Sequence, residues 1–329
     1  MFKKSKLFFI IAETPLHPGS GGEVTGLVDL PIQRERHTNF PKIEASGLKG
    51  CIKEAFRDLN PEISINGQKI KPKDEIFYNA GDKDRKTDYL SLVFGPEDTE
   101  EAHAGALAFT DARILLFPVK SLKGVFAWVT CPMVLERFRE DLGLAKIIDH
   151  PLNVDFSILI NTLPEQTNIF IESKVVLEEF TFELKENKET SKIAKYLADK
   201  IFPNDTYKFW REKLEKDLAI LSDDDFEHFV TSSTEVITRT RIDDITGTVK
   251  SGALWTEEYL PQDTILYSIA IASPIRVEKD EAKGVFKAET PDKEAEMVLQ
   301  FFEVGIPNII QIGGNQTIGK GFVRIQILK

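Results

Sequence analysis

Periodic apolar segments near the two ends of the chain constrain its fold most. Residues 6–14 are rich in Phe and Ile, which predicts a buried strand. Apolar residues three and four positions apart then predict a helix that runs from an N-cap at Ser46 to about Leu59. Near the other end, Thr290 precedes a proline and a second helical pattern, and residues 321–328 predict a final strand. Each end therefore supplies one strand and one helix.

The middle of the chain supplies the remaining core strands. Residues 105–119 and 124–130 predict two strands joined by a short basic turn, and residues 169–184 and 264–273 are further β-rich stretches. Without its polar segments, the chain follows the order strand, helix, strand, strand, helix, strand. This order is typical of the ferredoxin-like (RRM-like) α+β fold, in which an antiparallel sheet carries helices on one face.

Three other segments are predicted as additions to this core. Residues 60–104 are polar and turn-rich, and residues 186–233 are charged, acidic and helical in pattern. The acidic run within the second segment is typical of a helix start, because carboxylates favour the positive end of the helix dipole. Residues 234–260 alternate β-branched residues around a DDITG turn, which predicts a protruding hairpin. The core is then discontinuous, with residues 1–59, 105–185 and 261–329.

The net charge of the 329-residue chain is −11, which argues against a general nucleic-acid binder. The charge is uneven, however. Residues 1–57 hold nine Lys or Arg against six Asp or Glu, and residues 305–329 hold three against none. A phosphate-binding face needs only local positive potential. An acidic protein with basic ends is suited to meeting RNA inside an assembly.

Neither secretion nor membrane insertion is predicted. The apolar run near the start covers only residues 7–12, and no small-residue cleavage site follows it. No stretch approaches the roughly 20 apolar residues that span a bilayer. The two cysteines, Cys51 and Cys131, lie far apart and offer neither a disulfide framework nor paired zinc ligands. We expect a cytoplasmic protein with no membrane partner.

The glycine-rich segment GGNQTIGKG matches part of a nucleotide-binding P-loop. Gly314, Gly319 and Lys320 have the right spacing, but Gly321 stands where a Ser or Thr must hold Mg²⁺. A predicted strand also follows, where the phosphates would need a helix N-terminus. An ATPase is therefore disfavoured. Backbone N–H groups of the loop, which begins at Gly313, can still approach phosphate oxygens near Lys320.

Three separated stretches resemble one known family. LHPGSGGEVTGLVDLPIQRERHTNFPKIEASGLKGCIKEAFR resembles the first block of the RAMP superfamily of CRISPR proteins, and IQIGGNQTIGKGFVRI resembles its C-terminal glycine-rich loop. TRTRIDDITGTVKSGALWTEEYLPQDTILY is similar to the thumb of one branch, the fourth Cmr subunit, which is the multi-copy backbone endoribonuclease of type III-B effector complexes. DLPIQRERHTNFP also favours this branch over its Csm counterpart. The resemblance implies a ferredoxin-like palm and makes the hairpin its thumb.

The resemblance also implies partners and an activity. These are a CRISPR RNA guide, a complementary single-stranded target RNA, further copies of the same chain and the other Cmr subunits. Each thumb would displace a nucleotide pair, so that the target is cleaved at regular spacing. Cleavage in the family depends on a divalent metal, Mg²⁺ or Mn²⁺.

The resemblance further assigns the cleavage residues. Asp29 matches the acidic residue of the family, with catalytic and metal-binding roles. His17, Glu257 and Tyr259 match supporting residues, and Glu258 competes with its neighbour for the glutamate position. RNA transesterification needs a deprotonated 2′-OH, an in-line nucleophile and neutralised charge on the phosphorane. An aspartate can act as the base or hold an ion that does so.

Guide binding is assigned to two basic or glycine-rich elements. Lys49, Lys53 and Arg57 form a stripe at helical spacing on the first predicted helix. The terminal loop contributes Gly313, Gly314, Gly319, Lys320 and Gly321.

Other functions remain open from the sequence. The chain could be a backbone subunit that binds guide and target without cutting them. It could also be a metal-independent endonuclease that processes precursor CRISPR RNA with His or Tyr as acid and base. A nucleotide-binding enzyme that uses the terminal loop is the third alternative.

Overall fold

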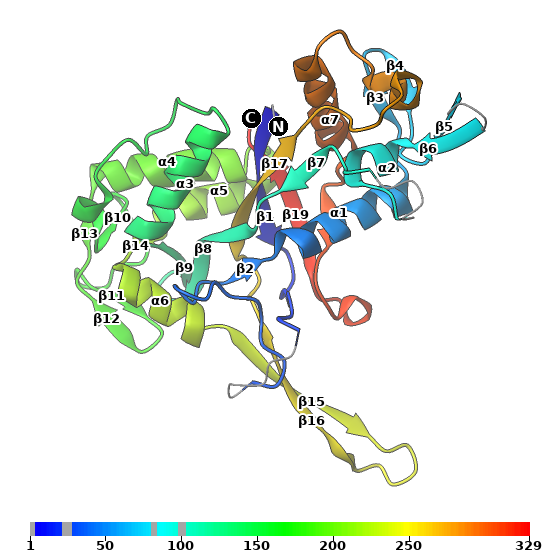
Figure 1. Cartoon of the computed structure of the whole chain (residues 1–329). Coiled ribbons are helices and arrows are strands. Elements are labelled where there is room, and N and C mark those ends of the chain that lie inside the picture. The colour runs from blue at the N-terminus through cyan, green and yellow to red at the C-terminus, as the bar shows by residue number, and fades with distance from the viewer. Residues whose placement is uncertain (1–3, 22–27, 80–83, 98–102) are drawn as a thin grey trace.

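A large mixed sheet forms the centre of the computed structural model, which describes residues 4–21, 28–79, 84–97 and 103–329 (Figure 1). Its main path has the order β13-β10-β14-β9-β8-β17-β1-β19-β18, while β2 pairs with β8 and β7 pairs with β17. The strands of this sheet are β1 (Lys4–Ala12), β2 (Lys42–Ile43), β7 (Leu107–Phe109), β8 (Ala112–Lys120), β9 (Phe126–Thr130), β10 (Thr162–Leu163), β13 (Lys185–Glu186), β14 (Leu218–Ile220), β17 (Ile265–Ala272), β18 (Ile309–Gln311) and β19 (Phe322–Ile327).

Strand β1 lies in the middle of this sheet. It pairs antiparallel with β17 on one side and with β19 on the other, and β8 pairs antiparallel with the far edge of β17. Every residue from Leu7 to Ala12 is buried, because both faces of the strand are covered. The predicted buried strand is confirmed. The strand predicted over residues 105–119 is present with one interruption, because β7 and β8 both pair antiparallel with β17 and only Thr110 and Asp111 separate them.

Two long helices pack on one part of the sheet. They are α1 (Ala45–Leu59) and α7 (Pro291–Gly305). Phe56 of α1 stacks on Phe301 of α7 with ring centroids 5.3 Å apart, and the neighbouring Phe302 contacts Phe8 of β1 at 5.4 Å. These rings join both helices to the strand and form the core on this side.

The two helices begin differently. As predicted, Thr290 caps α7, since its hydroxyl accepts a hydrogen bond from Lys293 N at 3.3 Å. The predicted N-cap at Ser46 is wrong. Helix α1 begins at Ala45, and its first N–H donates to Asp111 Oδ1 at 2.9 Å. A carboxylate from the distant segment between β7 and β8 thus takes the place of a local cap.

The segment predicted to be helical over residues 186–233 has three helices and also a strand. The helices are α4 (Lys188–Ile201), α5 (Lys208–Lys216) and α6 (Asp223–Ser232), with the short 3₁₀ helix η2 (Asp205–Tyr207). The strand β14 lies in the main sheet between β9 and β10, which was not predicted. Its three residues are apolar and buried, so the sheet rather than local periodicity determines their conformation. The acidic run does begin α6, which Ser222 caps.

The remaining elements comprise the helix α3, one long hairpin, and several shorter helices and strand pairs. They are α2 (Tyr89–Phe94), α3 (Pro132–Leu144), the 3₁₀ helices η1 (Phe156–Leu159), η3 (Asp280–Phe286) and η4 (Gln316–Ile318), and the two-stranded pairs β3 (Ile63–Ile65) with β4 (Gln68–Ile70), β5 (Glu75–Asn79) with β6 (Asp84–Asp88), β11 (Val175–Leu177) with β12 (Phe180–Phe182), and β15 (Glu235–Ile242) with β16 (Val249–Tyr259).

Strands β15 and β16 project from the body of the molecule (Figure 1). They pair antiparallel from Glu235 opposite Tyr259 to Ile242 opposite Val249. The first four residues of β16 are exposed, and its last three are buried where the hairpin joins the body. Among the described residues, no helix is both long and apolar enough to cross a membrane.

Candidate functional site

Four stretches that are distant in sequence meet where the hairpin joins the body. Leu16 exchanges backbone hydrogen bonds of 2.9 and 2.8 Å with Leu260, just after β16. Leu30 N donates to Thr256 O at 3.0 Å, which adds a short parallel bridge beside β16. Gly314 N donates to His17 O at 3.0 Å, so the terminal glycine-rich loop closes the group. The structure therefore brings the predicted cleavage residues and the loop into one neighbourhood.

Glu257 and Tyr259 form the centre of a buried polar cluster. The Tyr259 hydroxyl donates to Glu257 Oε2, and the same carboxylate oxygen accepts from Arg239 Nε at 3.2 Å and Asn315 Nδ2 at 3.0 Å. Asn315 Nδ2 and an Arg239 amino group also donate to the Tyr259 hydroxyl, at 2.7 and 3.1 Å. Trp255 Nε1 donates to the other Glu257 oxygen at 2.9 Å. These contacts satisfy a carboxylate that is only 6% exposed.

The contacts of the cluster shift the pKa of Glu257 and the pKa of Tyr259 in opposite directions. Burial acts to raise the pKa of Glu257, but hydrogen bonds from Tyr259, Trp255 and Arg239 outweigh it and lower that pKa below its usual value. Burial raises the pKa of Tyr259, and its hydrogen bond to the Glu257 carboxylate raises it further. At neutral pH the pair is therefore an ionised carboxylate and a neutral phenol.

His17 lies beside this pair. Its ring centroid is 5.4 Å from that of Tyr259, and Nδ1 donates to Glu258 O at 2.6 Å. In the neutral imidazole this bond leaves Nε2 as an acceptor. Gly19 lies close to that nitrogen, since a Cβ built at Gly19 would be 3.0 Å from Nε2. The family-matched histidine is thus both a structural link and a group with one available nitrogen.

Asp29 lies on the surface and is fixed to β16 by Thr256. Its Oδ2 accepts from Thr256 N at 2.7 Å and from Thr256 Oγ1 at 2.8 Å. These bonds, led by the backbone N–H, lower the pKa of Asp29. Its Oδ1 makes no hydrogen bond to another described residue. Asp29 is therefore ionised, held in place and accessible.

Strand alternation separates the two neighbouring glutamates. Glu258 accepts from Ile32 N at 3.1 Å and from Thr234 Oγ1 at 2.9 Å, and it pairs with Arg34 at 2.5 Å. Successive strand residues face opposite sides, so Glu257 faces Tyr259 while Glu258 faces the 30–34 segment. Glu257 is therefore the glutamate that contacts Tyr259, while Glu258 contacts the 30–34 segment.

Three glycines of the terminal loop have positive φ angles, and two of them also lie close to backbone carbonyl oxygens. A side chain at Gly313 would approach His17 O within 2.2 Å, and one at Gly321 would approach Ile312 O within 2.2 Å. Gly319 has open space around it, so positive φ alone requires glycine there. Lys320 Nζ lies 5.2 Å from the centroid of the Tyr259 ring, a cation–π distance that connects the loop to the cluster.

The basic stripe on α1 is largely neutralised. Arg57 pairs with Glu97 and Glu54, and Lys53 pairs with Glu97 at 3.3 Å while donating to Gly95 O. Burial lowers the pKa of Lys49, and the neighbouring Lys53 charge lowers it further. The stripe exists, but carboxylates already compensate two of its three charges.

Several contacts of the cluster were not predicted from sequence. Arg239, Asn315, Trp255 and Thr256 all make side-chain hydrogen bonds there. The period-two pattern of β16 could have indicated Trp255, because it shares a face with Glu257 and Tyr259. In the described ranges, no three His, Cys, Asp or Glu side chains gather closely enough to hold a metal ion.

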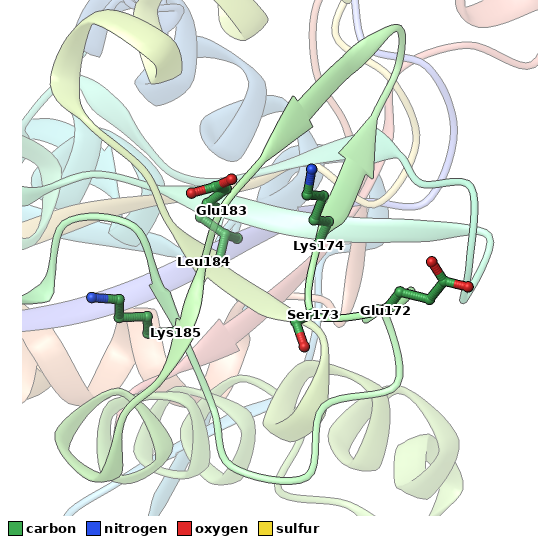
Figure 2. A pocket seen from close by; sticks show the side chains of 6 residues that line it. All are labelled: Glu172, Ser173, Lys174, Glu183, Leu184 and Lys185. Atoms are coloured by element: carbon green, nitrogen blue, oxygen red, sulfur yellow. The ribbon is translucent and has the colours of Figure 1, made fainter.

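A shallow pocket is lined by charged side chains elsewhere in the molecule (Figure 2). It lies beside the β11–β12 pair, and its lining residues are Glu172, Ser173, Lys174, Glu183, Leu184 and Lys185. None of these belongs to the cluster at the base of the hairpin.

Comparison with known proteins places the chain among related sequences and structures. The family model of the RAMP superfamily matches residues 9–324. The CRISPR system Cmr endoribonuclease Cmr4 of Pyrococcus furiosus is 36% identical over 327 residues, which cover 98% of this chain and 96% of that protein. The CRISPR system CMR subunit Cmr4 of Saccharolobus solfataricus is 31% identical over 342 residues, with the same coverage of the two chains. The crystal structure of oligomeric Cmr4 from Pyrococcus furiosus matches with a TM-score of 0.66 and 29% identity, and covers 99% of this chain and 98% of that one.

Proposed function

This chain belongs to the RAMP superfamily, and on that premise we propose that it is the repeated backbone subunit of a type III-B Cmr effector complex. In this role it binds CRISPR RNA and cleaves complementary target RNA at regular spacing. The relative that supports this is called a Cmr endoribonuclease and is similar over nearly the whole of both chains. The complex works in the cytoplasm, which agrees with two free cysteines.

The family resemblance supports the partners that we propose. They are the guide, the single-stranded target, further copies of this chain and other Cmr subunits. An oligomeric crystal form of a relative supports self-association.

We also propose that the core is a ferredoxin-like palm and that the 234–260 hairpin is a thumb. The strand order β19-β1-β17-β8, antiparallel throughout, supports the palm, as do α1 after β1 and α7 after β17. The second and third palm strands in chain order are then β8 and β17. The sequence predicted the consecutive segments 105–119 and 124–130 in these places. Projection of β15 and β16 from the body supports the thumb (Figure 1).

The terminal loop is the better supported of the two guide-binding elements. Its positive-φ glycines leave backbone groups uncovered by side chains, and Lys320 adds a charge that forms no ion pair with a described residue. On α1, Lys49 remains a candidate phosphate contact, because Lys53 and Arg57 already pair with Glu97. Release from Glu97 would be needed before those two could bind phosphate.

Target cleavage is assigned to Asp29 with His17, Glu257 and Tyr259. Cleavage by transesterification forms a bond from the 2′-oxygen to phosphorus and breaks the bond to the 5′-oxygen, which receives a proton. A carboxylate with a lowered pKa is a weak base, so Asp29 is better suited to holding a divalent ion than to removing the 2′-proton itself. His17 Nε2, which is left as an acceptor when Nδ1 donates to Glu258 O, is the candidate acceptor for that proton.

The donor set at Asp29 fits a weakly held Mg²⁺ or Mn²⁺. One accessible carboxylate, in a structure whose described residues include no group of three His, Cys, Asp or Glu able to hold a metal ion, resembles magnesium sites that share their ion with RNA phosphates. When bound there, the ion would neutralise charge on the phosphorane. The residues of this chain would hold Asp29, through Thr256, and orient the target.

The observation that carries this proposal is the attachment of Asp29 to β16 through Thr256. This contact attaches the family-matched aspartate to the strand residue next to Glu257.

The test is reconstitution of this chain with the other Cmr subunits and a defined guide. We expect regular cuts in complementary RNA with Mg²⁺ or Mn²⁺, and none after EDTA treatment. Guide and target binding without any cut would favour a non-cleaving backbone subunit. Cuts in precursor CRISPR RNA that survive EDTA would favour a processing endonuclease.

A further inference from the structure

Asn315 makes the closest contact between the terminal loop and the buried pair. Its Nδ2 donates to the Tyr259 hydroxyl at 2.7 Å and to Glu257 Oε2 at 3.0 Å. The Tyr259 hydroxyl and Glu257 Oε2 are themselves hydrogen-bonded neighbours, so the Asn315 amide bridges the two acceptors as a bifurcated donor. The residue thus holds the phenol and the carboxylate together from outside the hairpin.

The Tyr259 hydroxyl is saturated in this arrangement. It donates its proton to Glu257 and accepts hydrogen bonds from Asn315 and Arg239. A phenol has one hydrogen and two acceptor lone pairs, so its orientation is fixed on every side. Buried and fully satisfied polar networks of this kind hold one arrangement rigidly.

The backbone of Asn315 explains how it reaches the pair. It adopts φ = 66°, between Gly313 and the 3₁₀ turn η4, and asparagine tolerates this left-handed conformation better than most residues do. In the same loop Gly314 bonds His17 O, and Lys320 lies against the Tyr259 ring. The loop therefore touches the pair through both an amide and a charge.

We propose that Asn315 is a positioning residue, which holds Glu257 and Tyr259 in their working arrangement and links this arrangement to the glycine-rich loop. This inference rests on the proposed function, because it assigns the pair a part in RNA cleavage. It adds a route by which RNA seated on the loop acts on the cleavage residues through one side chain.

The first test is Asn315→Gly in the reconstituted complex. Glycine keeps the positive φ and removes only the amide. We expect guide loading and target KM to stay unchanged and kcat to fall about tenfold, the effect of one lost hydrogen bond to a charged group. Asn161→Gly is the matched control, because Asn161 also adopts a positive φ (59°) but its side chain makes no hydrogen bond in the cluster. Its kcat should equal that of the wild type.

A double-mutant cycle with Tyr259→Phe separates positioning from loop folding. If Asn315 acts through the phenol, Asn315→Gly should change kcat little in the Tyr259→Phe background. A tenfold loss that persists there would overturn the proposal, as would an unchanged kcat in the single variant.

The same cycle measured by thermal unfolding of the full chain needs no cleavage. Coupled losses in Tm would show that Asn315 holds the pair, and additive losses would overturn this. If Asn315→Gly and Tyr259→Phe are coupled in Tm while complexes with wild-type sequence fail to cut, the proposed function fails and the contact stands.

Discussion

The two faces of the last residues of β16 hold different parts of the chain. Trp255, Glu257 and Tyr259 share one face, which contacts Asn315 of the terminal loop. Thr256 and Glu258 share the other face, which holds the 29–34 segment. One strand thus connects the cleavage candidate Asp29 with the loop assigned to the guide.

The surroundings of the two glutamates show what each face does. Glu258 and its partner Arg34 have side chains 7% and 16% exposed, so this ion pair is sealed against solvent. Glu257 is equally buried, but its partner Arg239 is 29% exposed. The Glu258 face therefore fixes the segment that contains Asp29 to the strand, whereas the Glu257 face extends to the surface where RNA would bind.

The largest effect should come from Glu258→Ala. This change leaves Ile32 N–H without its acceptor and the Arg34 guanidinium without its carboxylate partner, although Arg34 still donates to the carbonyls of Asn39 and Val230. Breaking a buried ion pair from one side costs about 3–5 kcal/mol of unfolding free energy. Urea unfolding of the full chain measures it. Glu62→Ala, which removes a solvent-exposed pair with Lys69, is the control and should change stability little. Equal losses in the two variants would contradict a structural role for the Glu258 face.

The next effect concerns the residue that this face carries. Asp29→Asn keeps shape and loses charge, so the complex should assemble, load guide and bind target normally. Cleavage with Mg²⁺ or Mn²⁺ should fall about 100-fold or more. Thermal unfolding should be nearly unchanged, because Asp29 is exposed. Asp155→Asn, at another exposed loop aspartate that accepts a backbone hydrogen bond, is the matched control. Wild-type cleavage by the Asp29 variant would falsify its catalytic assignment.

Local patterns predicted much of the fold but only part of this division. The buried first strand, the Thr290 cap and the start of α6 depend on neighbouring residues, so the sequence indicates them directly. The apolar spacing that predicts this helix includes Leu59, yet Leu59 is 63% exposed whereas Phe56 is buried. A 3.6-residue period places a face only to within one position at a helix end.

Contacts between residues distant in sequence determine the parts of the site that the sequence did not predict. Asp29 bonds Thr256 across 227 residues, and Asn315 bonds Tyr259 across 56. No local pattern encodes which distant loop approaches a strand, and only the family resemblance indicated the cleavage residues. Compensation of Lys53 and Arg57 by Glu97 escaped prediction for the same reason, because Glu97 belongs to a different, turn-rich segment.

A smaller effect should follow a change on the other face. Glu257→Gln removes the charge that orients Tyr259 and pairs with Arg239. We expect cleavage to fall about tenfold, with guide and target affinities unchanged, because the pair acts on the reaction rather than on RNA binding. Single-turnover kinetics of the complex measure it. Glu258→Gln should instead lower the urea midpoint more than the rate. The reverse pattern in these two variants would exchange the roles of the faces.

The smallest effect concerns whether the lysines near the Glu257 face contact the phosphates of the guide RNA. Each lysine that contacts a phosphate releases counterions, so its loss lowers the salt slope of RNA binding by about one unit or slightly less. Lys320 lies on the Tyr259 ring and forms no ion pair with a described residue, so Lys320→Ala should produce this change, and Lys49→Ala should add to it. Lys53 already pairs with Glu97, so Lys53→Ala should leave the slope nearly unchanged. Guide affinity measured from 50 to 300 mM salt, about the range over which such slopes are resolved, distinguishes these variants. Equal slopes for the Lys320→Ala and wild-type proteins would mean that Lys320 does not contact the guide. A lowered slope for Lys53→Ala would mean that Glu97 releases Lys53 when RNA binds.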